Sequence, residues 1–123
     1  MIHETAIIDS NAKIGNNVEI GPYCVIGSEV HLGNNNKLYS HVNISGNTKI
    51  GEGNVFYPFC SIGNNPQDLK YNGEKTELII GNNNKIREYV TIHPGTIGGG
   101  GKTIIGNGCL FMISSHIAHD CII

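Results

Sequence analysis

The sequence predicts an all-β solenoid, and three features of the sequence point to this fold class. A large apolar residue recurs at every sixth position through the first half of the chain: Ile2, Ile8, Ile14, Ile20, Ile26, Leu32, Leu38, Ile44, Ile50, Phe56 and Ile62. A small or compact residue usually stands two positions earlier, and this spacing places both side chains on one face of a strand. Glycine often follows the large residue and marks a turn. A unit with only two inward side chains cannot bury itself alone, so such units must stack.

This pattern resembles the hexapeptide repeat of left-handed parallel β-helices, in which three hexapeptides form one triangular coil. The left hand comes from that resemblance, because the usual chirality rule for parallel crossovers favours the opposite hand. We therefore expect a single domain covering residues 1–123. The predicted fold is a left-handed parallel β-helix, a triangular solenoid of about six coils with two external loops.

Residues 1–62 carry the uninterrupted repeat and are expected to be scaffold. Glycine and asparagine runs follow many repeat units, and both residues tolerate the left-handed backbone that sharp corners need. The cysteines occupy the small inward position and form no CxxC motif, so we expect reduced packing residues at Cys24, Cys60, Cys109 and Cys121. Three isolated histidines are expected to be solvated or to contact another subunit: His3, His31 and His41.

The repeat is interrupted twice. Residues 63–79 contain no valid repeat position, since Asp68 and Glu74 stand where large apolar residues would fall, and the pattern resumes at Ile80. A second interruption follows Ile92 and lasts until Ile105. Loops that break a strict repeat cost ordering entropy and usually carry binding or chemistry. The two interruptions are therefore the predicted external loops and the first places to look for function.

Counting three repeat units per coil assigns the large residues to the three faces. One column then contains Ile26, Ile44, Ile62, Ile92 and Ile117. Both predicted loops leave the corner after this column, and His119 and Asp120 occupy the same corner one coil above the second loop. A histidine beside a carboxylate suits general base catalysis near neutral pH. Spacing alone leaves open that the histidines here, His116 and His119, are simply exposed at a polar turn.

Four segments resemble the UDP-N-acetylglucosamine 3-O-acyltransferases of lipid A biosynthesis: residues 67–71, 87–93, 98–101 and 116–121. The resemblance implies that His119 is the general base and that Asp120 orients it. It implies an enzyme that moves a 3-hydroxyacyl chain from acyl carrier protein to the sugar 3-hydroxyl, within a cleft between subunits of a homotrimer. The residues implied to bind the sugar nucleotide are Gln67, Asp68, Lys70, His93 and His116. The resemblance implies no metal and no cofactor, with acyl-carrier protein as the donor substrate.

Three other functions are compatible with a repeat of this kind. The γ-class carbonic anhydrases use a similar helix with three histidines on zinc between subunits, for which His93, His116 and His119 could converge. Asp120 and the loop of residues 67–71 have no role in that scheme. A structural or ice-binding solenoid would show threonine ladders on an outer face, and the outward positions of the first coils show none. Among acyltransferases, the alternative is a related hexapeptide-repeat sugar or amino-sugar N-acyltransferase.

The composition and the ends of the chain indicate its partners, its location and its completeness. A net charge of −2 argues against general affinity for nucleic acid or anionic membranes. No segment approaches the ~20 apolar residues of a membrane helix, so we expect a cytoplasmic protein. The family implied by the resemblance continues through further coils and a helical domain, including a backbone amide that serves as oxyanion hole. Because the chain stops at Ile123, in mid-repeat, we expect a fragment or truncated product of doubtful activity on its own.

Overall fold

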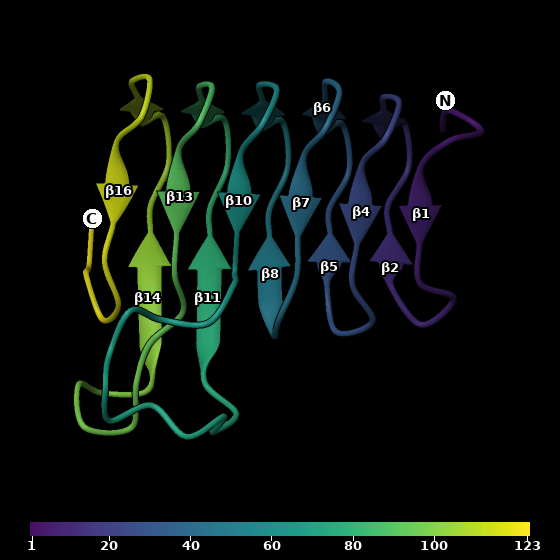
Figure 1. Ribbon diagram of the computed structural model, residues 1–123. Helices are drawn as coiled ribbons and strands as arrows, with labels where there is room; N and C mark the ends of the chain where they lie inside the picture. Colours follow the sequence, from purple (N-terminus) through teal and green to yellow (C-terminus); the bar gives the residue numbers. More distant parts are fainter.

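The computed structural model describes all 123 residues and shows a triangular prism whose faces are three parallel sheets (Figure 1). The first sheet contains β1 (Ile7–Ile8), β4 (Val25–Ile26), β7 (Asn43–Ile44), β10 (Ser61–Ile62), β13 (Thr91–Ile92) and β16 (His116–Ile117). The second contains β2 (Lys13–Ile14), β5 (His31–Leu32), β8 (Thr48–Ile50), β11 (Glu77–Ile80) and β14 (Lys102–Ile105). The third contains β3 (Glu19–Ile20), β6 (Lys37–Leu38), β9 (Val55–Phe56), β12 (Lys85–Ile86) and β15 (Leu110–Phe111).

Successive strands belong to successive sheets, so every three strands complete one coil. Parallel bridges between Ile2 and Ile20, and between Ile104 and Ile122, extend the third and second sheets by one level each. The left-handed parallel β-helix of about six coils predicted from the sequence is therefore confirmed. The two ends of the chain lie at opposite ends of the prism (Figure 1). The structure contains no helix that could span a membrane.

The register of the first sheet confirms the column predicted from the repeat count. Ile26 pairs with Ile44, Ile44 with Ile62, Ile62 with Ile92, and Ile92 with Ile117. The strand pairing continues across both loops, so neither loop contributes a repeat unit to a coil. The corner that follows the first sheet therefore carries both loops and the His119–Asp120 turn.

The core runs along the prism axis and is built from the repeat positions. The large residues of the middle coils are fully buried, with Ile44, Phe56 and Ile62 at 0% exposure. Burial decreases toward the ends of the prism, where a coil has a neighbour on one side only, and Ile2 is 49% exposed. For the same reason the prediction that all four cysteines are buried is wrong for two of them, since Cys109 and Cys121 are only partly buried.

All four cysteines are unpaired, as predicted. Two of them, Cys24 and Cys60, are fully buried. Burial raises the pKa of the Cys60 thiol to about 12, so this side chain stays protonated at neutral pH and acts as a packing residue.

Asparagines at the inward position form a buried ladder that joins successive coils. The backbone N–H and Nδ2 of Asn54 both donate to Oδ1 of Asn36, at 2.8 and 3.1 Å. The backbone N–H of Asn84 donates to Oδ1 of Asn54 at 2.9 Å, and that of Cys109 donates to Oδ1 of Asn84 at 2.8 Å. Each amide thus satisfies backbone groups that the corner would otherwise bury without a partner.

Left-handed backbone occurs at glycines and asparagines of the corners, as expected, and also at other residues. At the corner between the third and first sheets, φ lies between 56° and 67° for Tyr23, His41, Phe59 and Tyr89. Their rings stack along the corner with centroids 5.2, 4.8 and 5.4 Å apart. Favourable contacts between neighbouring rings offset the backbone strain of these positions.

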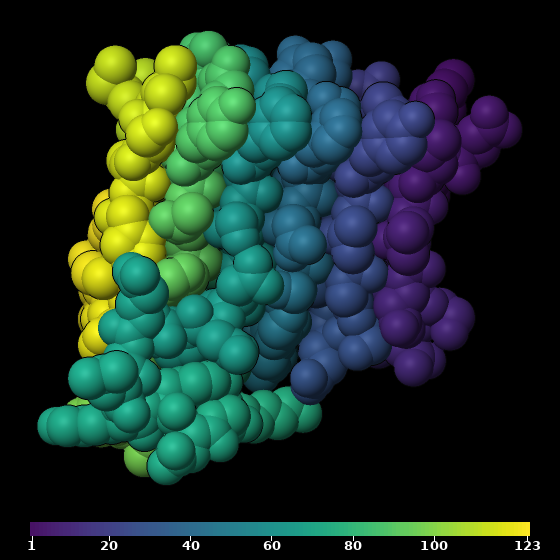
Figure 2. Space-filling model, viewed as in Figure 1, coloured from purple at the N-terminus to yellow at the C-terminus, as the bar shows by residue number.

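The first loop (residues 63–76) follows β10, and the second loop (residues 93–101) follows β13. In Figures 1 and 2 the first loop projects from the prism on the side where the C-terminal coils lie. β11 begins at Glu77, earlier than the predicted end of the loop, because Glu77 is held by the second loop. The Glu77 N–H donates to Gly101 O at 2.9 Å, and the Gly95 N–H donates to Glu77 O at 3.0 Å.

Candidate functional site

His119 and Asp120 lie together in the turn that follows β16. Nδ1 of His119 is 2.8 Å from Oδ2 of Asp120. The side chain of His119 is 35% exposed and that of Asp120 only 12%. A nitrogen that faces a carboxylate carries the proton of the neutral ring, which leaves Nε2 with a free lone pair. The pair therefore presents a proton acceptor to solvent and a half-buried carboxylate behind it.

The carboxylate of Asp120 is held from two sides. Oδ1 accepts from the backbone N–H of Thr96 at 2.8 Å, and Oδ2 accepts from the hydroxyl of Thr96 at 2.7 Å. The backbone N–H of Asp120 donates to Oγ1 of Thr103 at 2.9 Å. Burial raises the pKa of Asp120, but the hydrogen bonds from Thr96 and His119 outweigh it and hold the pKa below its ordinary value. Asp120 is therefore ionised at neutral pH.

Two further histidines lie beside this pair on neighbouring coils. The rings of His93 and His116 meet edge-on, with centroids 4.8 Å apart. Nδ1 of His116 is 2.7 Å from the hydroxyl of Thr91, whereas Nδ1 of His93 is buried and has no hydrogen-bond partner. Burial lowers the pKa of His93, and the charges of His116 and His119 lower it further. Because the charges of His116 and His119 both act on His93, we treat the three histidines as one electrostatic cluster.

The first loop carries the other predicted site residues. Gln67 and Lys70 are exposed, and Lys70 makes no ion pair. Oδ1 of Asp68 accepts from the backbone N–H of Lys70 at 3.0 Å, and the Asp68 carbonyl accepts from Tyr71 N–H at 3.0 Å, which folds the loop tip into a turn.

The structure thus brings together four of the predicted site residues, namely His93, His116, His119 and Asp120. No hydrogen bond or ion pair joins Gln67, Asp68 or Lys70 to them within one chain.

Sequence reasoning missed the threonines that position the polar side chains. Thr91 stands immediately before the inward Ile92 and therefore points out of the same face as His116, so the repeat phase contained this information. Thr103 occupies the small inward position two residues before Ile105, which the phase also indicated. Thr96 lies in the second loop, where no repeat applies, and nothing in the sequence pattern placed it against Asp120.

The structure shows no group of three or more His, Cys, Asp or Glu side chains arranged to hold a metal ion. Nδ1 of His116 faces Thr91 and Nδ1 of His119 faces Asp120. A zinc site of the carbonic anhydrase type needs three convergent imidazole ligands, and within one chain the cluster does not supply that arrangement.

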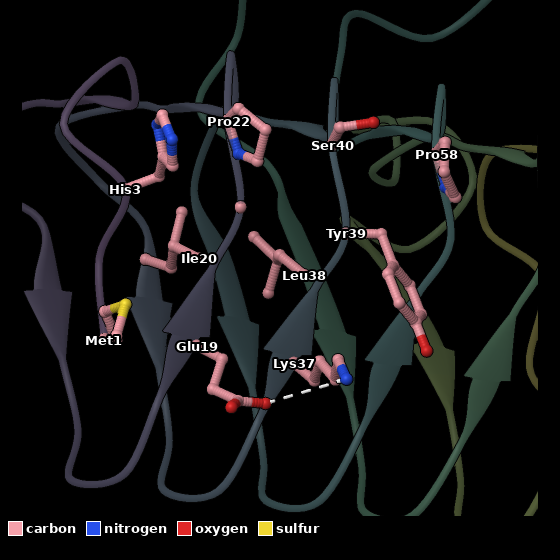
Figure 3. A pocket seen from close by; sticks show the side chains of 11 residues that line it. Met1, His3, Glu19, Ile20, Pro22, Lys37, Leu38, Tyr39, Ser40 and Pro58 are labelled. Carbon is pink, nitrogen blue, oxygen red and sulfur yellow. Dashed lines mark ion pairs between the residues drawn. The ribbon is translucent and has the colours of Figure 1, made fainter.

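The largest hollow lies elsewhere, on the N-terminal coils. It has a volume of about 480 Å³ and is lined mainly by residues of the first three coils, among them Met1, His3, Pro22, Leu38 and Tyr39 (Figure 3). Its charged groups, Glu19 and Lys37, are 3.9 Å apart and neutralise one another. We place the candidate site at the histidine cluster instead, because three histidines and an ionised carboxylate lie together there.

Comparisons with known proteins show what the whole chain is similar to. A family model described as bacterial transferase hexapeptide (six repeats) matches residues 1–32. The chain is 57% identical over 98% of its length to the acyl-[acyl-carrier-protein]–UDP-N-acetylglucosamine O-acyltransferase of Rickettsia peacockii, covering 46% of it, and 59% identical to that of Rickettsia bellii, covering 43%. The crystal structure of the UDP-N-acetylglucosamine O-acyltransferase from Moraxella catarrhalis superposes with a TM-score of 0.97 at 55% identity, over 99% of this chain and 48% of that one. The resemblance predicted from the sequence is confirmed, and the chain spans less than half the length of these relatives.

Proposed function

We propose that this chain, which matches the N-terminal part of UDP-N-acetylglucosamine O-acyltransferases in sequence and fold, carries the general base of an acyl transfer. The acyl donor is a 3-hydroxyacyl chain on acyl carrier protein, and the acceptor is the 3-hydroxyl of UDP-N-acetylglucosamine, in lipid A biosynthesis. One observation carries the proposal: the partly exposed His119 imidazole is hydrogen-bonded at Nδ1 to a half-buried, ionised carboxylate.

In this reaction His119 Nε2 takes the proton of the sugar 3-hydroxyl while the oxygen attacks the thioester carbonyl carbon. A carbon–oxygen bond forms, and the carbon–sulfur bond breaks as the tetrahedral intermediate collapses. The departing thiolate of the carrier takes the proton from Nε2, so the imidazole returns to its starting state. Asp120 stabilises the imidazolium that forms between these steps. The chemistry requires no metal and no cofactor beyond the two substrates.

We assign binding of the sugar nucleotide to the remaining predicted residues, Gln67, Asp68, Lys70, His93 and His116. The assignment is supported by side chains that lack partners of their own. Lys70 is exposed without an ion pair, and Nδ1 of His93 is buried without a hydrogen bond. A lysine ammonium suits a diphosphate, and an unpartnered buried nitrogen suits a polar ligand atom.

We further propose that the active unit is a homotrimer acting in the cytoplasm, where both substrates are accessible. The proposal is supported by the lack of any hydrogen bond or ion pair within one chain between the site residues of the first loop and the histidine cluster, because a neighbouring subunit could supply the missing partners. Sedimentation velocity at micromolar concentration checks the assembly, for which we expect a trimer. A clean monomer at that concentration would contradict it.

The test of the catalytic proposal uses a chimaera in which residues 1–123 precede the C-terminal part of the Rickettsia bellii relative. We expect His119→Ala to reduce kcat by ~10² to 10⁴, the range typical of general base catalysis. Asp120→Asn should retain the fold and lose less activity, and His116→Ala should chiefly raise KM. His31→Ala, an exposed histidine on β5, is the matched control and should change neither constant.

Two outcomes decide against the assignment. If His116→Ala abolishes turnover while His119→Ala retains it, the base is misassigned. If an acceptor with a 3-amino group reacts faster than one with a 3-hydroxyl, the enzyme is an N-acyltransferase and the proposed acceptor is wrong.

A further inference from the structure

We propose that the second loop (residues 93–101) is a clamp on the Asp120 carboxylate, with Thr96 and Gly99 as positioning residues for the base. The inference rests on the proposed role of His119. Neither Thr96 nor Gly99 touches the histidine, and both act on it through Asp120. The clamp gives the glycine-rich interruption of the repeat a chemical purpose, because it fixes the carboxylate that fixes the imidazole.

Thr96 supplies two donors to the carboxylate and is itself held in place. Its backbone N–H and its hydroxyl bind Oδ1 and Oδ2 of Asp120 at 2.8 and 2.7 Å. Its carbonyl accepts from the N–H groups of Gly99 and Gly101 at 3.2 and 2.7 Å, and the residue is only 6% exposed. Two donors on two oxygens prevent the carboxylate from rotating about its Cβ–Cγ bond.

Gly99 closes the clamp by a direct backbone approach. A Cβ at this position would overlap Oδ2 and Cγ of Asp120, so only glycine fits without displacing the carboxylate. The Gly99 N–H also donates to the Thr96 hydroxyl at 3.2 Å. Because that oxygen accepts from Gly99, its own proton is directed to Oδ2 of Asp120.

Gly98 provides a matched contrast within the same run. A Cβ at Gly98 would meet nothing within 4 Å, and neither Gly98 nor Gly99 has φ in the left-handed region. Alanine at the two positions therefore has the same backbone cost and differs only in whether it reaches the carboxylate. A loop that served only as a linker would tolerate alanine equally at both positions.

The consequence for His119 concerns which ring nitrogen carries the proton. With Oδ2 fixed 2.8 Å from Nδ1, the neutral ring holds its proton on Nδ1 and leaves Nε2 able to accept one. A carboxylate free to rotate would allow both tautomers, and only one of them can act as a base toward solvent. Loosening the clamp should therefore lower kcat with little effect on KM.

The first experiment measures this tautomer directly on residues 1–123, without reference to activity. We expect ¹⁵N NMR of the His119 ring to show mainly the Nδ1–H form in the wild-type chain. Thr96→Val keeps the shape and the backbone donor but loses the hydroxyl, and should shift the ring toward a mixture of tautomers, as should Gly99→Ala. Thr96→Ser should restore the wild-type spectrum and Gly98→Ala should leave it unchanged. An unchanged spectrum in Thr96→Val overturns the clamp.

The second experiment measures kinetics in the chimaera described above. We expect Thr96→Val and Gly99→Ala to lower kcat by up to ~10²-fold, the cost of misplacing a catalytic group by about 1 Å, while Gly98→Ala stays within about twofold. In an Asp120→Asn background Thr96→Val should add less than about a twofold loss, because the group through which it acts is gone. Independent losses that multiply would overturn the proposal.

The two experiments separate failure of the clamp from failure of the proposed function. If Gly99→Ala prevents folding, the Thr96 variants decide alone. If the tautomer responds as expected while His119→Ala leaves transfer intact, the clamp stands and His119 is not the base. If His119→Ala abolishes transfer but the tautomer never responds, His119 is the base and the clamp is wrong.

Discussion

The ring of His93 meets that of His116 edge-on, with centroids 4.8 Å apart and planes inclined at 73°. His93 lies one coil below His116, at the corner that carries the whole candidate site. Its Nδ1 is buried without a partner, and burial followed by the neighbouring histidines lowers its pKa from the ordinary value of 6.5. Just below pH 6.5, His93 is therefore neutral in the folded protein and protonated in the unfolded chain.

This relationship predicts that stability decreases as the pH falls below about 6.5. The unfolded chain binds a proton at His93 near 6.5, and the folded chain binds it only at lower pH, so the unfolded state gains from acidification first. Urea unfolding of the wild-type chain at pH 8, 7, 6 and 5 should show this loss, and His93→Gln should show less of it. The lowered pKa of Asp120 acts in a separate window, below about 3.8.

His31→Gln is the control for this pH experiment, because His31 is exposed on β5. Its unfolding midpoints should follow those of the wild-type chain at every pH. A His93→Gln chain that loses as much stability as wild type on acidification would show that another group is responsible.

We predict that Lys70→Ala weakens binding of UDP-N-acetylglucosamine and leaves the melting temperature nearly unchanged. Lys70 is exposed and makes no ion pair, so its removal costs the fold at most ~0.5 kcal/mol. Isothermal titration with the chimaera measures the binding. Lys85→Ala removes an exposed lysine of the third sheet and should bind as wild type does. If Lys70→Ala lowers the melting temperature clearly as well as the affinity, the loop lysine has a structural role.

The burial of the first sheet predicts that two of its isoleucines contribute very differently to the free energy of unfolding. Ile44 is 0% exposed and Ile7 is 67% exposed. Ile44→Ala should lower the free energy of unfolding by about 2–5 kcal/mol, because it removes buried methyl groups and leaves a cavity. Ile7→Ala makes the same chemical change at the surface and should cost ~0.5 kcal/mol or less. Urea unfolding distinguishes these values, and similar costs at both positions would contradict the observed register.

The asparagine ladder predicts a comparable cost at a polar position. Asn54→Ala removes the acceptor for Asn84 N–H and the donor to Gly81 O, which lies 2.9 Å from Nδ2. Leaving buried backbone groups without partners should lower the free energy of unfolding by about 1–3 kcal/mol. Asn65 is exposed in the first loop and makes no side-chain hydrogen bond, so Asn65→Ala is the control. If Asn54→Ala is as stable as Asn65→Ala, water satisfies the backbone groups that Asn54 otherwise bonds.

The sequence by itself determined the fold, both loops and the corner on which the site stands. A six-residue period that repeats through the chain allows only one pairing of the strands in which every large residue is buried. Ile62 and Ile92 follow this pairing although the first loop separates them in the sequence. It also placed His119 and Asp120 in one turn, since they are adjacent in sequence. The hand of the helix came from a family resemblance, because the period is the same for either hand.

Only the tertiary structure decided how that turn is held. Thr96 reaches Asp120 across 24 residues, from a loop in which no repeat constrains the backbone. Gly99 looks like its neighbour Gly98 in the sequence, and they differ only in the distance to a carboxylate on another coil. Repeat periodicity reports which side chains are buried, whereas hydrogen bonds within a loop depend on where its backbone goes, and for that reason the positioning residues could not be read from the pattern.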